Sequence, residues 1–337
     1  MPKNIDNNIE NTLKVLNPKQ KKVIWKRYGL GGKRETLQEI GDLLGITRER
    51  VRQIENQSIA KIRKDAKEYL VEFANTAKKH LESVGGVRED NRFLEEVARL
   101  TDAGETSNLK NKMRFFFFAA GEPLYEKETP SAKNFWYTDG KAKARLASFT
   151  NQILQMCKNI ERTKVIESKE FTKNVEGAPD AHLLSIGKKF AWNPFGDFGL
   201  ASWPEINPRN VRDKAYLAVK KYGKPLHFEG IAKLIHEQGV SARPVNTQTV
   251  HNELIKDNRF VLVGRGMYAL KEQGYEEGTV KEIIATLLRE KGPLHPKNVV
   301  ELVNKKRFLK ENTILLNLQN RKHFKRLENG TYDIHKA

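Results

Sequence analysis

The chain has 337 residues, of which 61 are lysine or arginine, 42 are aspartate or glutamate and one is cysteine. This length favours several small domains over one large core. No apolar run approaches the roughly 20 residues that a transmembrane helix needs, and residues 1–10 are too polar for a secretory signal. The single cysteine, Cys157, excludes an internal disulfide and a zinc site built on cysteine pairs. We therefore expect a soluble, cytoplasmic protein without a membrane partner.

The formal net charge is +19 at pH 7 and the isoelectric point is about 9.7. Such an excess suits a polyanionic partner, because each neutralised phosphate releases condensed counterions. Basic residues outnumber acidic ones in residues 1–84 and 205–337, whereas the two are nearly balanced in residues 85–204. This distribution predicts nucleic-acid-binding modules at both ends and a connecting or assembling region between them.

The N-terminal end predicts short helices with clear boundaries. Asn17 followed by Pro18 is typical of a helix start, and Gly29 is typical of a helix end. Thr36 and Glu39 form a capping box at the start of a second helix. The buried stripe of this second helix is expected to consist of Leu37, Ile40, Leu43 and Leu44.

A third helix follows after a tight turn at Gly45-Ile46, with Thr47 as its cap. A short helix, a glycine turn and a second capped helix constitute a helix-turn-helix. The side of the third helix that is expected to pack inward consists of Val51, Ile54 and Ser58, together with Ile46 in the turn. The opposite, polar side consists of Arg48, Glu49, Arg52, Gln53 and Asn56.

This polar side suits the major groove of duplex DNA. Arginine can bind guanine through two hydrogen bonds, glutamine can pair with adenine, and glutamate can accept from cytosine N4. The helix start at Thr47 also favours a nearby phosphate. The alternative is the solvated face of an ordinary helix with alternating charges. The capped turn before the helix favours the groove-reading interpretation.

These residues resemble the fourth conserved region of the housekeeping sigma factors of bacterial RNA polymerase. The resemblance is carried by Tyr28-Gly29-Leu30, Thr36-Leu37-Gln38-Glu39-Ile40-Gly41, Thr47-Arg48-Glu49-Arg50-Val51-Arg52-Gln53-Ile54-Glu55 and Ala60-Lys61-Ile62-Arg63. It implies a domain that reads the minus-35 promoter element in the major groove and docks on the polymerase beta-flap. The implied base-reading residues are Arg48, Glu49 and Gln53, and the implied phosphate or base-edge contacts are Arg50 and Arg52.

The sequence also departs from that family. Sigma factors carry an upstream helical region that binds the core enzyme and captures melted promoter bases, and only 16 residues precede the helix that Asn17 caps. We therefore do not expect a complete, stand-alone sigma factor. The first helix carries Lys19-Gln20-Lys21-Lys22 where the family usually has an Arg-Glu pair, which places docking on the polymerase flap in question.

Apolar residues continue beyond the third helix at steps of three or four as far as Gly85-Gly86. They predict one long helix with a single apolar stripe, formed by Ile59, Ile62, Ala66, Tyr69, Phe73, Ala77, Leu81 and Val84. The stripe can pair with a second copy in a homodimer, or fold back on the middle region. Its low density of leucine and isoleucine favours folding back.

The middle region, residues 86–190, is expected to be mostly helical, with a diverged winged helix as one interpretation. Helices are predicted over residues 93–100, 109–120 and 142–160, and a two-stranded ribbon over residues 124–127 and 135–138. Phe115–Phe118 are predicted to be core residues, because no basic groove residues interleave with them. Residues 191–211 are rich in aromatic residues, glycine and proline, and are expected to form an ordered connector.

The C-terminal third contains an internal repeat, with units over residues 212–274 and 275–337. The matching pairs are Pro225-Leu226-His227 with Pro293-Leu294-His295, Asn246-Thr247 with Asn312-Thr313, Phe260 with Phe324, and Tyr268 with Tyr332. Each unit is predicted to contain three helices and a hairpin, with the hairpin turns at residues 264–266 and 328–330. This order is typical of a winged helix.

Residues 212–270 resemble the HARE-HTH domain, a winged helix-turn-helix found in the delta subunit of bacterial RNA polymerase, in some restriction systems and in chromatin proteins. The resemblance is carried by Asp213-Lys214-Ala215-Tyr216, Pro225-Leu226-His227-Phe228, Arg259-Phe260 and Tyr268-Ala269-Leu270. It implies a domain that binds nucleic acid or mediates contacts in transcription complexes. The second unit is more diverged.

The third helices and one wing of the repeats supply further candidates for DNA contact, namely Gln248, Asn252, Lys256, Arg265, Lys310, Asn317 and Arg321. An ordinary solvated basic surface is the alternative for each of them. His227 and His295 precede helices and are interpreted as helix-start or packing residues rather than metal ligands. The sequence holds no Walker loop, no Gly-x-Ser-x-Gly elbow and no metal-ligand pair on a helix. We therefore predict no catalytic residues, no metal and no cofactor, and the protein is not expected to be an enzyme.

The predicted fold is mainly α, with a sigma-like helix-turn-helix in residues 1–85, a helical middle region and two tandem winged helix-turn-helix units. The predicted function is that of a sequence-specific transcription regulator that binds double-stranded DNA in the cytoplasm as a nucleoid-associated protein. One alternative is an accessory subunit, similar to delta, that acts through protein contacts on the RNA polymerase core. Another is the specificity subunit of a nucleic-acid-processing system.

Overall fold

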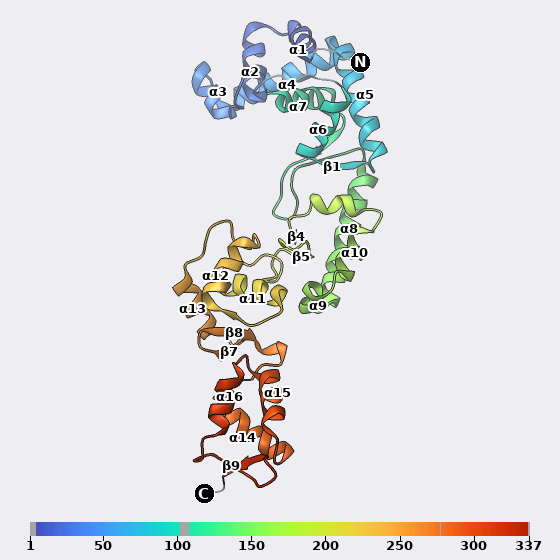
Figure 1. The fold of residues 1–337 in the computed structure, drawn as a ribbon. Coiled ribbons are helices and arrows are strands. Elements are labelled where there is room, and N and C mark those ends of the chain that lie inside the picture. The colour runs from blue at the N-terminus through green and yellow to red at the C-terminus, as the bar shows by residue number, and fades with distance from the viewer. Residues whose placement is uncertain (1–4, 102–107, 277, 336–337) are drawn as a thin grey trace. The chain divides into compact units, whose positions relative to one another are not determined.

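The computed structural model describes residues 5–101, 108–276 and 278–335, and its fold is mainly helical (Figure 1). The chain divides into two compact units. Unit 1 comprises Met1–Ile160 and Lys173–Phe190, and unit 2 comprises Glu161–Thr172 and Ala191–Ala337. None of the helices in the described residues is long and apolar enough to cross a bilayer.

Unit 1 consists mainly of helices and contains one small sheet. Its helical segments are α1 (Ile5–Lys14), α2 (Pro18–Tyr28), α3 (Leu37–Leu44), α4 (Arg48–Asp65), α5 (Lys67–Ser83), α6 (Asp90–Leu100), α7 (Leu109–Ala120), α8 (Gly140–Asn159) and the 3-10 turn η1 (Ala181–Ser185). The strands β1 (Val87–Glu89), β2 (Leu124–Glu126) and β3 (Phe135–Tyr137) form an antiparallel sheet in the order β1-β3-β2. The helix and ribbon predictions for the middle region are confirmed, whereas α1 and β1 were not predicted from the sequence.

One hydrophobic core joins residues from both sides of Gly85. It includes Ile9 and Leu13 of α1, Phe73 of α5, and the phenylalanines of α7 together with Trp136 of β3. The rings of Phe73 and Phe117 stack with their centroids 5.3 Å apart. Phe115, Phe116 and Phe117 are fully buried, so their predicted place in the core is confirmed. The domain boundary expected at residue 85 runs through this single core.

The long helix predicted between Ile59 and Val84 is interrupted at Ala66. This residue has φ −133° and ψ 25°, so α4 ends and α5 begins in a new direction. The break lets the apolar stripe pack against α6 and α7, with Phe73, Ala77 and Leu81 buried. The prediction of one continuous helix is therefore wrong. Folding back on the middle region is confirmed, and the stripe is not available for pairing with a second copy.

A buried carboxylate ties α6 to α7 and to the sheet. Asp90, at the start of α6, is 3% exposed. Arg114 donates from Nη2 to one Asp90 oxygen at 2.6 Å and from Nε to the other at 3.2 Å, and the Trp136 indole Nε1 donates at 2.7 Å. These three hydrogen bonds offset the cost of removing the carboxylate from water.

Unit 2 contains a hairpin followed by two similar groups of elements. Its first elements are α9 (Arg162–Glu167), β4 (Phe190–Trp192), whose first residue is the last of unit 1, and β5 (Phe198–Leu200). The helix α10 (Glu170–Glu176) begins in unit 2 and ends in unit 1. The first group contains α11 (Val211–Tyr222), β6 (Leu226–His227), α12 (Phe228–Glu237), α13 (Thr247–Lys256), β7 (Phe260–Gly264), β8 (Met267–Leu270) and the 3-10 turn η2 (Lys271–Gln273). The second group contains α14 (Val280–Lys291), α15 (Pro296–Lys306), α16 (Glu311–Leu318), β9 (Phe324–Arg326) and β10 (Tyr332–Ile334).

The two groups share one pairing register. In the first group, Leu226 of β6 pairs with Tyr268 of β8, and in the second an isolated bridge joins Leu294 to Tyr332. The helix starts differ, however. Asn246 precedes α13 and its Oδ1 accepts from the Thr249 amide at 3.0 Å, whereas α16 already begins at Glu311. Asn312 and Thr313, which correspond to Asn246 and Thr247 in the repeat, therefore lie in the first turn of α16.

The connector expected over residues 191–211 is ordered by a buried charge cluster. Asp197, next to β5, is fully buried, and its carboxylate lies 2.9 Å from Lys169 Nζ and 2.8 Å from Lys221 Nζ. Asn193 Nδ2 donates to the same carboxylate at 2.8 Å. Because Lys221 belongs to α11, the cluster fixes the hairpin on the first repeat.

A buried guanidinium joins the two repeats. Arg307 Nη1 donates to the carbonyl of Leu262 at 2.5 Å and to the carbonyl of Glu276 at 3.2 Å. Lys306 Nζ lies 2.8 Å from the carboxylate of Glu276. Burial holds the pKa of Arg307 below its ordinary value.

Replacing Asp90 should strongly destabilise the protein. Asp90→Ala leaves the Arg114 guanidinium and the Trp136 N–H without their partner, so we expect a loss of about 3–5 kcal/mol in the free energy of unfolding. Urea unfolding measures this loss. The control is Glu95→Gln, because Glu95 is exposed and pairs with the exposed Lys110, so the expected loss is much smaller than for Asp90→Ala. Equal losses for the two variants would contradict the account.

Candidate nucleic-acid interface

The turn between α3 and α4 is built by local caps. The Thr36 hydroxyl accepts from the Glu39 amide at 3.2 Å, and the Glu39 carboxylate accepts from the Thr36 amide at 2.6 Å. Gly45 ends α3 with φ 64°, a conformation that glycine adopts without strain. The Thr47 hydroxyl then accepts from the Arg50 amide at 3.2 Å and starts α4. The predicted caps of both helices are confirmed.

The inner side of α4 packs on α2 and α3. Val51 and Ile54 form a small core with Val23 of α2 and Ile40 of α3. Ser58 is also buried, and its hydroxyl donates to the Ile54 carbonyl at 2.6 Å. The predicted inward side of α4 is thus confirmed.

The predicted stripe of α3 is only partly correct. Ile40 is fully buried and Leu37 and Leu44 are half-buried, but Leu43 is 50% exposed. With only eight residues, this helix presents a narrow side to the small core of Val23, Ile40, Val51 and Ile54. Leu43 lies outside that side.

Gly41 permits the close approach of α3 to the turn. A Cβ atom at this position would lie 2.7 Å from the carbonyl oxygen of Ile46. Because that oxygen belongs to the backbone of the turn, a side chain at position 41 would push α3 away from the start of α4. Gly41 belongs to the motif Thr36-Leu37-Gln38-Glu39-Ile40-Gly41, but nothing in that motif indicates this role.

The outer side of α4 is exposed and partly organised by its own side chains. Arg48, Glu49, Arg50, Arg52, Gln53 and Asn56 are all exposed, as is the cap residue Thr47. Arg52 donates to Glu49 at 2.6 and 2.9 Å, and Arg50 Nη1 donates to Gln53 Oε1 at 3.0 Å. The hydrogen bond from Arg52 holds the pKa of Glu49 below its ordinary value, so Glu49 is ionised at neutral pH.

These pairings were not predicted, although their spacing of three residues on a helix indicates them. Within the residues that the structure describes, Arg48 and Asn56 form no hydrogen bond or ion pair through their side chains. The outer side therefore presents Arg48 at the helix start with its donors uncommitted.

Contacts with α2 and α7 hold α4 in place. Arg27 of α2 donates from Nε to Glu55, in the middle of α4, at 3.3 Å. Near the C-terminal end of α4, Arg63 donates to the carbonyls of Ala119 and Phe118 at 2.7 and 2.9 Å, which satisfies acceptors at the end of α7. Sequence patterns give no signal for these contacts, because their partners lie far apart along the chain.

In the first repeat of unit 2, α13 brings three predicted residues together. Gln248, Asn252 and Lys256 are exposed at steps of four, and Gln248 Nε2 donates to Asn252 Oδ1 at 3.2 Å. Arg265 is exposed in the turn between β7 and β8.

The second repeat does not follow this pattern. Lys310 precedes α16 and Arg321 follows it, so the prediction that both lie on the helix is wrong. Asn317 does lie on α16, but it is half-buried and its Nδ2 donates to the Thr313 carbonyl at 2.8 Å. The neighbouring Leu316 is 70% exposed, so α16 lacks the polar side that α13 has.

The two histidines lie at helix starts. His227 precedes α12, and its Nδ1 accepts from the Glu229 amide at 3.5 Å. His295 precedes Pro296, the first residue of α15. Their interpretation as helix-start residues is confirmed. No group of three potential metal-ligating side chains occurs among the described residues.

The family model for sigma-70, region 4 matches residues 12–64. This segment contains α2, α3 and nearly all of α4, including the exposed polar side. Among curated proteins, the segment is similar to the "RNA polymerase sigma factor sigF, chloroplastic" of Arabidopsis thaliana, with 40% identity over 60 residues, 18% of this chain and 11% of that protein. It is also similar to the "RNA polymerase sigma factor SigA" of Microcystis aeruginosa, with 46% identity over 56 residues, 16% of this chain and 14% of that protein.

A further relative is the "RNA polymerase sigma-B factor" of Nostoc sp., with 44% identity over 68 residues, 19% of this chain and 20% of that protein. The chain thus spans no more than a fifth of the length of these three relatives. No solved structure matches the chain. The similarity to region 4 therefore concerns one segment of unit 1.

Two glycine substitutions should have opposite effects on stability. Gly41→Ala should lower the free energy of unfolding by about 1–3 kcal/mol through the clash with the Ile46 carbonyl, although alanine is the better helix former. Gly230→Ala in α12 is the control, since its Cβ would meet only a Leu226 side-chain atom at an ordinary 3.6 Å.

For the control we expect a gain of up to about 1 kcal/mol. Urea unfolding, followed separately for the transition of each unit, measures both changes. Stabilisation by Gly41→Ala would show that α3 does not approach the turn as described.

Proposed function

We propose that the chain is a sequence-specific protein that binds duplex DNA and regulates transcription, with the outer side of α4 in the major groove. The observation that carries this proposal is that α4 begins at a capped turn, buries its apolar side in unit 1 and leaves its polar side exposed. The region 4 match over the same residues supports it.

The exposed side chains fit defined roles in the groove. Arg48 can donate to the O6 and N7 atoms of guanine, Gln53 can pair with adenine, and the ionised Glu49 can accept from cytosine N4. Arg50, Arg52 and the amides at the helix start fit phosphates. Freeing Glu49 from Arg52 costs little, because solvent screens an ion pair between exposed side chains.

Unit 2 fits a supporting role in the same proposal. We infer that its repeats are winged helix-turn-helix domains and that the first is similar to HARE-HTH domains. The exposed Gln248, Asn252 and Lys256 of α13 and Arg265 of the hairpin would then add contacts to the DNA backbone. This role agrees with the net charge of +19.

The second candidate is an accessory subunit that acts through protein contacts on RNA polymerase. It is favoured by the similarity of residues 12–64 to RNA polymerase sigma factors and by Trp25 of α2, whose exposed ring offers an apolar contact. Selection of bound duplexes from a random pool, compared with capture of core polymerase from a DNase-treated lysate, separates the two candidates. An enriched sequence supports the DNA-reading function, whereas polymerase capture without enrichment supports the accessory subunit.

Replacing Arg48 should remove preference at one base pair. We expect Arg48→Ala to lose about 1–3 kcal/mol of binding free energy on the selected duplex. When the base pair that Arg48 contacts is replaced, the binding free energy of the variant should not fall further. Fluorescence anisotropy on a panel of single-base variants measures this. Lys61→Ala, an exposed residue nearer the far end of α4, is the control and should leave base preference unchanged. Equal losses on every duplex for Arg48→Ala would refute the assigned role.

A further inference from the structure

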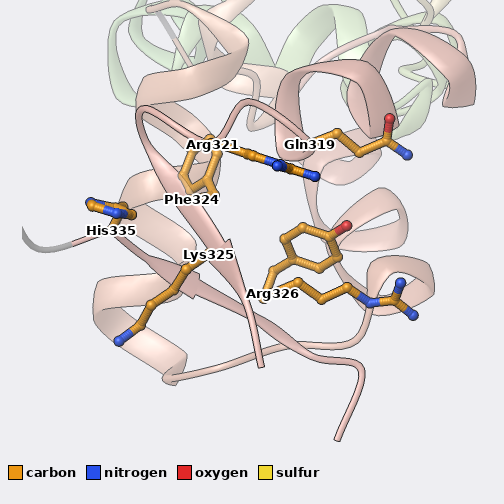
Figure 2. Close-up of a pocket in the computed structure, with 7 residues that line it drawn as sticks. Gln319, Arg321, Phe324, Lys325, Arg326 and His335 are labelled. Carbon is orange, nitrogen blue, oxygen red and sulfur yellow. The ribbon is translucent and has the colours of Figure 1, made fainter. Parts of the chain in front are cut away.

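The second repeat of unit 2 carries an open pocket of about 670 Å³ beside its hairpin. The lining contains two arginines, a lysine, a histidine, a glutamine and two aromatic residues, and no carboxylate. Figure 2 shows that the side chains of Gln319, Arg321 and Arg326 extend to one side of the hairpin, while that of Lys325 extends to the other.

Strand pairing explains the arrangement on the arginine side. Arg326 of β9 pairs with Tyr332 of β10, so their side chains are cross-strand neighbours on one face. Lys325 pairs with Asp333, and these neighbours occupy the other face because successive strand residues alternate. The arginine side therefore combines two guanidinium groups, an amide and a phenol.

The two arginines are not needed to build this fold. Aligning Phe324 with Phe260 places Arg326 at the position of Leu262, which pairs with Tyr268 as Arg326 pairs with Tyr332. The same alignment places Arg321 at the position of Asp257. In the first repeat Asp257 is buried and binds Arg259 at 2.7 Å. The second repeat thus has a cation, Arg321, at the position of an anion in the first repeat. It has a second cation, Arg326, at the position of a leucine.

The charge of these arginines is not neutralised locally. Arg321 and Arg326 are exposed, and neither forms an ion pair within the residues that the structure describes. Two unpaired cations beside one cavity repel each other, and a bound anion would remove this unfavourable electrostatic interaction. Guanidinium groups are planar forks that bind phosphate through paired hydrogen bonds.

We propose that this pocket is a further nucleic-acid site, beyond α4 and the first repeat, in which Arg321 and Arg326 bind two backbone phosphates, with Gln319 and Tyr332 as further hydrogen-bonding groups. The site is separate from the outer side of α4 and reads no base. Its ligand is the phosphodiester backbone of a duplex or of a single strand.

The test uses the full chain with Arg48→Ala and Gln53→Ala introduced, so that contacts by α4 do not mask the pocket. Binding of a labelled duplex and of one of its strands is followed as a function of salt concentration. Arg321→Gln with Arg326→Gln is compared with Arg289→Gln and Lys291→Gln, which remove two exposed charges from α14. Thermal unfolding checks that each variant folds.

Loss of two phosphate contacts should reduce the slope of log K against log salt by about 1.8 for a duplex or about 1.4 for a single strand. The nucleic acid that shows the reduction is the ligand of the site, and the α14 variant should leave its slope nearly unchanged. If the double variant fails to fold, Arg326→Leu restores the residue of the first repeat and should reduce the slope by about half as much.

Equal slopes for the pocket and α14 variants would overturn the proposal. So would a loss of binding to a polyglutamate peptide with unchanged binding to both nucleic acids, which would identify an acidic protein as the ligand. If the pocket does not bind nucleic acid, the selection of bound duplexes with the unmodified protein still tests base reading by α4. The two proposals are therefore tested independently.

Discussion

The one-sided burial of α4 is the constraint on which the proposed interface depends. Val51 and Ile54 pack against Val23 and Ile40, and this packing fixes the rotation of the helix about its axis. Every polar residue on the other side then points to solvent, because the helical period separates the two sets. Gly41 sets the distance between α3 and the turn, because it has no Cβ atom to clash with the Ile46 carbonyl oxygen. The position of the start of α4 depends on this close approach.

The rest of unit 1 supports this helix. The break at Ala66 turns α5 back over α6 and α7, and the buried Asp90 joins α6, α7 and the sheet into one core. Arg63 connects that core to the end of α4. In unit 2, the hairpins of the two repeats have the same strand register but different side chains, since Leu262 of the first repeat corresponds to Arg326 of the second. Repetition therefore provides a scaffold on which surface charge has diverged.

The amino-acid sequence predicts those helix boundaries that depend on contacts between residues close together in the chain. The caps at Asn17, Thr36 and Thr47 follow from hydrogen bonds within a few residues. The break at Ala66 is not predictable in this way, because alanine favours helix and only tertiary packing interrupts it. The same holds for the core that crosses Gly85. The exchange of Asp257 for Arg321 is visible in the sequence only after the repeats are aligned on Phe260 and Phe324.

The central claim is that Arg48 reads a base in the major groove. The most direct test replaces the guanine of the selected site with 7-deazaguanine, which removes the N7 acceptor and leaves base pairing intact. We expect this replacement to weaken binding by the parent protein and to leave the binding of the Arg48→Ala variant unchanged, because both changes remove the same contact. Equal weakening of parent and variant at every guanine of the site would contradict the account.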